Sequence, residues 1–141
     1  MKSIYSLLLA IVFLLSGCEK EHEIVHEIVH EEIDLTNTNW AIHQTQEIPV
    51  RANGNLPTLH FKDGVMGVGT NCNIAFSEYE STGNTIKFRG LSTTYKYCQD
   101  MQIEDYFGTK IRSISSYIYN DGKLYLYIGE RIIGSFKRLP E

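Results

Sequence analysis

Tight-turn signals between short segments of alternating apolar and polar residues constrain the fold of this chain more than any other feature. Asp63-Gly64 and Gly83-Asn84 are dipeptides typical of two-residue β-hairpin loops, because their residues tolerate positive φ values. A third signal, Asn120-Asp121-Gly122, lies nearer the C-terminus. Segments of period two joined by such loops form antiparallel strands, so the chain is predicted to be mainly β from about residue 36 onward.

The pairing of the first two hairpins follows from their apolar faces, because a slip of one residue turns every side chain to the opposite face of the sheet. A two-residue loop at the first turn pairs Phe61 with Met66 on an apolar face. The same kind of loop at the second turn pairs Tyr79 with Phe88. Both hairpins are therefore predicted with two-residue loops.

Two registers compete at the third turn. A two-residue loop would pair Tyr119 with Leu124 and mix tyrosine with aliphatic side chains on each face. A three-residue loop with Gly122 in the left-handed conformation instead pairs Ile118 with Leu124, so that one face is aliphatic. We predict the three-residue loop. It gathers four tyrosines on the other face: Tyr117, Tyr119, Tyr125 and Tyr127.

One helix is predicted between the strands, over about residues 100–113. Asp100 is a suitable N-cap. Apolar residues then recur at helical spacing: Ile103, Tyr106, Phe107, Ile111 and Ile114. Further strands are expected near Trp40–Gln44, Ile74–Phe76, Thr93–Tyr97 and Arg131–Leu139. The predicted fold class is α+β, mainly β, with about eight short antiparallel strands in a curved sheet or partly open barrel and one packed helix.

The N-terminus carries a processing signal. A short basic start and an apolar run from Ile4 to Leu15 precede Leu15-Ser16-Gly17-Cys18, which resembles a bacterial lipoprotein lipobox. Residues 1–17 are therefore predicted to be a signal peptide, and Cys18 is predicted to carry the lipid. An ordinary secretory signal with an incidental cysteine is the alternative.

The residues after Cys18 bear on location. Glu19 stands where an Asp would resemble an inner-membrane retention signal, so we expect an outer-membrane lipoprotein. The acidic Glu19-Lys20-Glu21 stretch is somewhat similar to surface-export signals of Bacteroidota lipoproteins, so the protein is expected to face the periplasm or the cell surface. Acyl chains on Cys18 would make the membrane a permanent partner.

Charge is concentrated in residues 18–35, which we predict to be a tether. Residues 19–34 hold seven of the 17 acidic residues and one of the 13 basic residues, so the remaining body, residues 36–141, is nearly neutral. The absence of a basic run in the sequence excludes nucleic acid as an expected partner. A chain of 141 residues accommodates one folded domain, which we assign to the body.

The tether contains H-E-x-x-H twice, and His22, His26 and His30 would lie near one face of a helix. This spacing binds zinc in metalloproteases, where the glutamate is the general base. The motif begins four residues after Cys18, however, and such an enzyme needs its helix buried behind a cleft. We therefore favour a solvated tether and predict no cofactor. Adventitious metal binding, or a zinc-dependent enzyme as a remote alternative, would use these histidines.

Cys72 and Cys98 remain once Cys18 is lipidated, and an exported protein meets an oxidising compartment. A disulfide between them is predicted, with two buried free thiols as the alternative. Closing this loop of 27 residues would stabilise the fold by about 3.6 kcal/mol through the entropy of the unfolded chain.

Two motifs resemble a known family. Gly69-Thr70-Asn71-Cys72-Asn73 with the later Tyr79, and then Leu91-Ser92-Thr93-Thr94-Tyr95-Lys96-Tyr97-Cys98, are similar to the META domain of the heat-shock-linked HslJ-like lipoproteins. That family carries G-C-N-x-x-x-G-x-Y followed by L-x-S-T-x-x-x-C. Asn73, Tyr79 and Thr94 match its motif positions.

The chain departs from that pattern at several positions. Asn71 and Ser77 stand where the family has glycine, and Tyr95 and Tyr97 stand where it usually has methionine. The resemblance implies a curved β-sheet packed by one helix. It supplies no catalytic residues to carry over.

We expect a lipid-anchored, non-enzymatic envelope protein with an interaction or stress-protection role, whose partner is an unknown envelope protein. The alternative is a binder of a small hydrophobic ligand within the curved sheet. His43 and His60 are the only histidines of the body, and no spacing of catalytic residues accompanies them.

Pairs of tyrosines two residues apart are candidates for a binding face. Tyrosines at i and i+2 share one face of a strand, and their rings suit recognition surfaces. The pairs are Tyr95 and Tyr97, Tyr117 and Tyr119, and Tyr125 and Tyr127. Cross-strand tyrosine ladders on an exposed sheet are the alternative.

Overall fold

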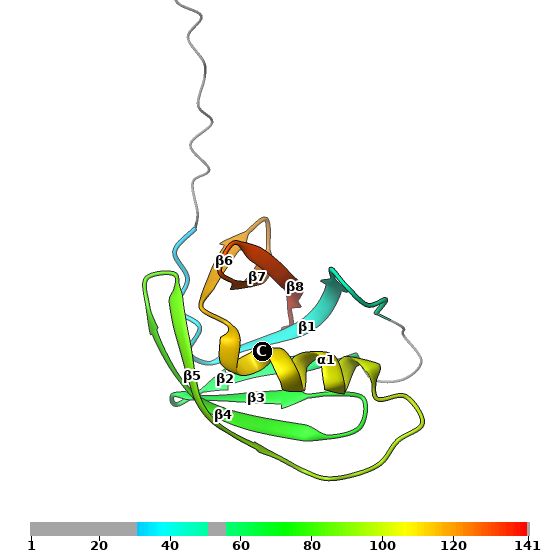
Figure 1. Cartoon of the computed structure of the whole chain (residues 1–141). Helices are drawn as coiled ribbons and strands as arrows, with labels where there is room; N and C mark the ends of the chain where they lie inside the picture. Colours follow the sequence, from blue (N-terminus) through cyan, green and yellow to red (C-terminus); the bar gives the residue numbers. More distant parts are fainter. Residues whose placement is uncertain (1–30, 51–55, 141) are drawn as a thin grey trace, which may run out of the picture.

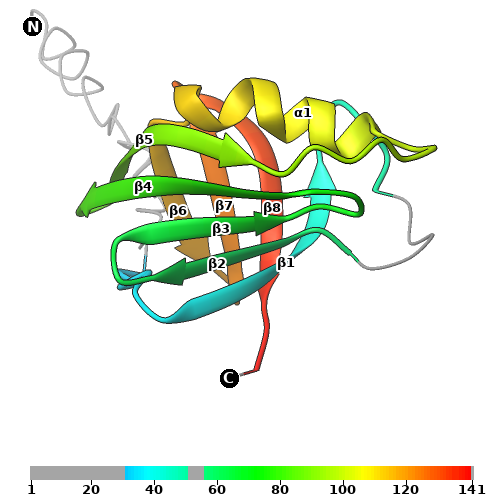
Figure 2. The same cartoon turned by 90° about the horizontal axis from the view of Figure 1, so that it is seen from below.

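The computed structural model describes residues 31–50 and 56–140. Adjacent strands are antiparallel, and the last strand pairs with the first, so the sheet closes into a barrel (Figures 1 and 2). The elements in chain order are β1 (Thr38–Thr45), β2 (Thr58–Lys62), β3 (Val65–Gly69), β4 (Ile74–Thr82), β5 (Thr85–Thr93), α1 (Gln102–Lys110), the 3-10 helix η1 (Ile111–Ser113), β6 (Ser116–Asn120), β7 (Lys123–Ile128) and β8 (Arg131–Arg138). The predicted mainly β fold with one helix is confirmed.

The barrel is weakest at the seam between β5 and β6. These strands share one residue pair, Thr85 with Ser116, whereas β4 and β5 pair along nearly their whole length. Figure 2 shows α1 running alongside β5 at this seam. The helix packs inward there, because the Tyr106 hydroxyl donates to the Ile133 carbonyl of β8 (2.7 Å) and the Phe107 ring contacts Phe136.

Large apolar side chains fill the barrel. Trp40 is fully buried, and its indole N–H donates to the Thr38 hydroxyl at 2.8 Å. The other largest buried side chains are Leu35, Phe61, Met66, Val68, Ile86, Ile111, Leu124, Leu126, Ile133 and Phe136. Because these side chains pack against one another in the interior, a ligand has to be sought at an opening of the barrel.

The first two predicted hairpins are confirmed, with Phe61 opposite Met66 and Tyr79 opposite Phe88. The three-residue loop predicted for the third hairpin is wrong. Asp121 and Gly122 both have positive φ (51° and 69°), as a two-residue type I′ loop requires.

The correct register turns Tyr117 and Tyr119 inward. Tyr117 is opposite Leu126, and Tyr119 is opposite Leu124. Tyr117 is only 4% exposed, and its hydroxyl donates to the Gly83 carbonyl at 2.8 Å. The prediction that four tyrosines share one face is therefore wrong, because a tyrosine whose hydroxyl has a buried acceptor can occupy the core.

The strand predicted over Thr93–Tyr97 is also wrong. β5 ends at Thr93, and the chain continues as a loop up to α1. The backbone N–H of Lys96 donates to the Asn73 side chain at 2.8 Å instead of extending the ladder.

A bulge near the end of β5 changes which side chains face the barrel. The register shifts between the Phe76 and Glu78 pairings of β4, and Gly90 on the facing strand has φ of +64°. One extra residue in a strand reverses its alternation. Phe88 consequently faces the core before the bulge, and Leu91 lines a cleft beside α1 after it.

Gly90→Ala is expected to destabilise the domain by about 1 kcal/mol. Open space surrounds the added Cβ, so the cost comes from the positive φ alone. Gly108→Ala in α1 is the matched control, because Gly108 also has open space but no positive φ. The control should stabilise the fold by up to about 1 kcal/mol in urea unfolding. Equal effects of the two substitutions would contradict the assigned bulge.

Candidate functional site

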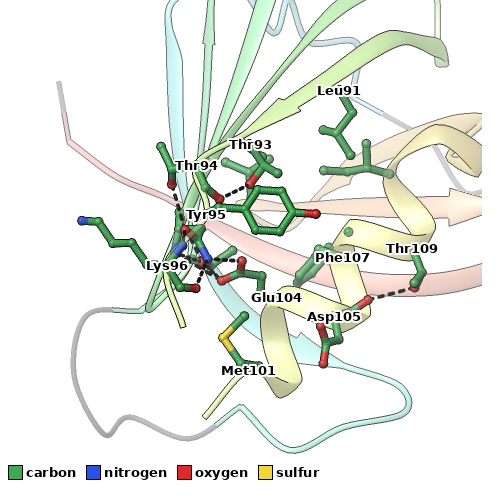
Figure 3. A pocket seen from close by; sticks show the side chains of 16 residues that line it. Leu91, Thr93, Thr94, Tyr95, Lys96, Met101, Glu104, Asp105, Phe107 and Thr109 are labelled. Carbon is green, nitrogen blue, oxygen red and sulfur yellow. Dashed lines mark hydrogen bonds between the residues drawn. The ribbon is translucent and has the colours of Figure 1, made fainter. Parts of the chain in front are cut away.

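A cleft of about 320 Å³ opens between α1 and the end of β5 (Figure 3). Its apolar lining comes from Val68, Ala75, Leu91, Phe107 and Ile111. Hydroxyl and charged side chains also line it, among them Thr70, Thr93, Lys96, Glu104, Asp105 and Thr109. None of the lining residues is a histidine or a cysteine.

Asn73 fixes one end of the cleft. Its side-chain amide donates to a Glu104 carboxylate oxygen and to the Lys96 carbonyl, the latter at 3.0 Å. Its side-chain oxygen accepts from the Thr94 hydroxyl at 2.9 Å and from the Lys96 N–H at 2.8 Å. Asn73 is 3% exposed, so this buried amide uses both its donor and its acceptor capacity.

Glu104 is the member of this network that sequence reasoning missed. The Thr70 hydroxyl lies 3.0 Å from a Glu104 carboxylate oxygen, and the Asn73 amide donates to the other oxygen. The carboxylate therefore links the first turn of α1 to the start of β4. Nothing in the local sequence signals this contact, because 31 residues separate the partners.

A disulfide joins Cys72 to Cys98, in agreement with the predicted pairing. It ties the residue before Asn73 to Cys98, within the loop that follows β5. The covalent bond and the Asn73 network thus hold the same loop at two neighbouring points.

Tyr95 and Tyr97 project from this loop. They are 97% and 95% exposed, which is exceptional for aromatic side chains among the described residues. In Figure 3 the Tyr95 ring lies beside the cleft, and Tyr95 belongs to its lining. Ile74 and Phe76 of β4 are about half exposed near this end of the barrel. We call Tyr95, Lys96 and Tyr97 the tyrosine loop.

The remaining candidate tyrosines do not join this surface. Tyr119 packs edge-on against Trp40, with 5.9 Å between ring centroids. Tyr125 and Tyr127 are half-buried on β7. Tyr79, the other family-motif residue, is buried against Phe61. The six tyrosines therefore do not form one face.

Tyr117 should make stability depend on alkaline pH. Burial raises the pKa of its hydroxyl, and the nearby Asp34 carboxylate acts in the same direction. A raised folded-state pKa contributes stability below the unfolded value of about 10, and this contribution is lost as pH rises through the folded value. We expect Tyr117→Phe to make the fall in urea midpoint between pH 8 and pH 11 shallower. Tyr97→Phe is the exposed control, and an unchanged fall in Tyr117→Phe would contradict the assignment.

Several predicted residues lie outside the described residues: Cys18, His22, His26 and His30. Within residues 31–50 and 56–140, no group of three or more His, Cys, Asp or Glu side chains could hold a metal ion. In the same ranges, no helix has the length and apolar character needed to cross a membrane.

The architecture defines a class of protein: a small antiparallel barrel of eight strands, with one helix packed alongside β5 and a cleft beside that helix. The META domain family model matches residues 33–137, so the chain belongs to the META domain family. The family match covers the disulfide, the Asn73 network and the cleft, and it carries no sign of an enzymatic role.

Solved structures share this fold. A protein from Burkholderia xenovorans, determined by NMR, has a TM-score of 0.64 and 17% identity, over 76% of this chain and 85% of that one. A second protein determined by NMR has a TM-score of 0.60 and 15% identity, over 72% of this chain and 88% of that one. No curated protein sequence matches the chain. At these identities the two structures support the fold alone.

Proposed function

We propose that this protein is a lipid-anchored, non-enzymatic META-domain protein of the cell envelope. Acyl chains on Cys18 would hold it in the outer membrane, and the cleft and the tyrosine loop would bind an envelope partner in an interaction or stress-protection role. The nearly complete exposure of Tyr95 and Tyr97 on a loop held by a disulfide carries the proposal. Exposed aromatic side chains on a fixed backbone bind at a small entropic cost.

The positions of the two ends of the barrel support this arrangement. The described N-terminal segment reaches the barrel beside the β4–β5 turn, where Glu31 to Ile33 line a hollow with Gly83 and Asn84 (Figure 1). The tyrosine loop lies beyond the other end of these nine-residue strands, each of which can span up to about 30 Å along its length. A tether to the membrane would therefore leave the tyrosine loop pointing away from the attachment point.

Site-specific photocrosslinking in intact envelopes tests the proposed interaction. A photoreactive amino acid at Tyr97 should give a discrete adduct with an envelope protein. The matched control is the same amino acid at Asn84, which is exposed at the tether end. Adducts of equal yield at both positions, or none at Tyr97, would count against a binding role for this loop.

The location of the protein in the cell envelope is tested by a separate measurement. Protease treatment of intact cells should digest a surface-facing body and spare a periplasmic one. Recovery of the lipidated chain in the inner-membrane fraction would refute the outer-membrane assignment.

The cleft itself favours a second candidate, which is a small hydrophobic ligand held between α1 and β5. Its volume and apolar lining suit such a molecule. Native mass spectrometry of the full chain should then show a co-purifying molecule that is lost in Gly108→Phe. Gly108 lines the cleft with open space around its Cβ, so the new ring can fill it. Gln102→Phe, on the same helix but outside the cleft lining, should retain the molecule.

A further inference from the structure

One edge of β5, which we call the open edge, pairs with no described strand for most of its length, and α1 runs alongside it (Figure 2). One side of β5 pairs with β4 from Thr85 to Thr93. The other side meets β6 at Thr85, and the Ile86 N–H donates to the Ser115 carbonyl at 3.1 Å. Beyond Ile86, no strand in the described part of the chain pairs with this side.

The hairpin register shows which backbone groups face the open edge. A two-residue loop makes Thr82 and Thr85 a hydrogen-bonded pair, so alternate residues of β5 direct their N–H and C=O groups toward β4. The backbone N–H and C=O groups of Ile86 are directed away from β4, as the bond to Ser115 shows. The backbone groups of Phe88 have the same direction. After the bulge at Gly90, the backbone groups of Leu91 and Thr93 are directed to that side as well.

Two hollows lie along this edge. The cleft occupies the end at Leu91 and Thr93, and a second hollow of about 390 Å³ extends from Thr85 to Arg89 against η1 and the residues that follow it. Between them they touch β5 at Thr85–Arg89, Leu91 and Thr93. Hollows next to unpaired strand groups suit an added strand, because a neighbouring strand lies only about 4.8 Å away.

We propose that the open edge of β5 binds an extended segment of a partner polypeptide by strand addition. The inference rests on the proposed interaction role and names the kind of partner. A polypeptide backbone supplies alternating donors and acceptors, which match Ile86 and Phe88 on one side of the Gly90 bulge and Leu91 and Thr93 on the other. An apolar side chain of the segment enters the cleft beside Leu91.

Two basic side chains indicate the chemistry of the partner segment at the end that lies in the second hollow. Lys87 and Arg112 line the second hollow, and neither forms an ion pair with another described residue. An acidic residue of the partner pairs with them. The partner segment is therefore extended, apolar in its middle and acidic at the end that lies near η1.

A peptide panel tests strand addition on the full-length chain in detergent micelles. The probes are fluorescein-labelled hexapeptides that alternate threonine with Val, Leu or Phe and carry glutamate at either end. At least one should bind and slow amide hydrogen exchange at Phe88, Leu91 and Thr93. N-methylation of its alternate amides, in the frame that faces β5, should weaken binding at least tenfold, while methylation in the other frame should not.

Protein variants test the predicted orientation. Gly108→Phe should weaken the tightest peptide at least tenfold, whereas Gln102→Phe should leave its affinity unchanged. Lys87→Glu should reverse the preference for the peptide end that carries glutamate.

Several outcomes would overturn the inference. No binding by any member of the panel, equal affinity of the two N-methylated forms, or no protection of β5 amides would each do so. Concentration-dependent dimerisation with protected β5 amides and no peptide would assign the edge to a second copy instead. Adducts at Tyr97 in envelopes, together with a negative panel, would leave the proposed function standing and exclude strand addition alone.

Discussion

Asn73→Ala should lower the free energy of unfolding by about 3 kcal/mol. The substitution removes the donor to the Glu104 carboxylate and the acceptor of both Thr94 and Lys96. Partners of a buried amide that lose their bonds keep the cost of their desolvation, and the cost is larger for a charged group. The melting temperature should fall by roughly 10–20 °C for a domain of this size.

Asn71→Ala is the control for this prediction. Asn71 is exposed, and its amide donates to the Asp100 carbonyl at 2.9 Å, so its loss should cost well under 1 kcal/mol. Urea unfolding of both variants measures the difference. Similar small effects for the two asparagines would show that the Asn73 network contributes little to stability.

Removal of the disulfide has the second large expected effect. The Cys72→Ser, Cys98→Ser double variant should lose about 3.6 kcal/mol, because the 26-residue separation leaves a long loop unconstrained in the unfolded chain. Wild-type protein unfolded in excess dithiothreitol should show the same loss. A loss under 1 kcal/mol in both experiments would exclude the disulfide as a major source of stability.

The two losses should not add. Asn73 and the disulfide hold the same loop, and contacts that share partners give non-additive effects. Once the disulfide is absent, the loop is freer to leave its place, so Asn73→Ala should cost less than it does in the oxidised protein. A double-mutant cycle by urea unfolding measures this coupling, and strict additivity would contradict the shared role.

Most of the fold could be predicted because turn residues and apolar alternation act locally. Asp63-Gly64 and Gly83-Asn84 set the registers of their own hairpins without reference to the rest of the barrel. The helix was likewise predictable, since its buried residues Ile103, Tyr106 and Phe107 recur at helical spacing.

The predictions that failed, and the site residue that was missed, have one physical origin: contacts between residues that lie far apart in the sequence. Tyr117 is placed inward because its hydroxyl donates to Gly83, 34 residues away in the sequence. Glu104 meets Asn73 across 31 residues, and no local pattern encodes that distance. The loop after β5 leaves the sheet because the Lys96 N–H donates to the Asn73 side-chain oxygen instead of to a neighbouring strand. Sequence reasoning could identify Asn73 and Thr94 from the family motif, but not the helix carboxylate that completes their network.

Pairing of the first strand with the last has a consequence for synthesis of the chain. Trp40 of β1 lies opposite Arg138 of β8, so roughly 100 residues must be made before β1 gains this neighbour. Contacts between such distant residues slow folding. Until β8 has been synthesised, the unpaired edge of β1 can pair with another chain and aggregate. Premature termination before β8 would leave β1 and β7 each with one open side, so residues 131–141 decide whether a nascent chain becomes a closed domain or a substrate for quality control.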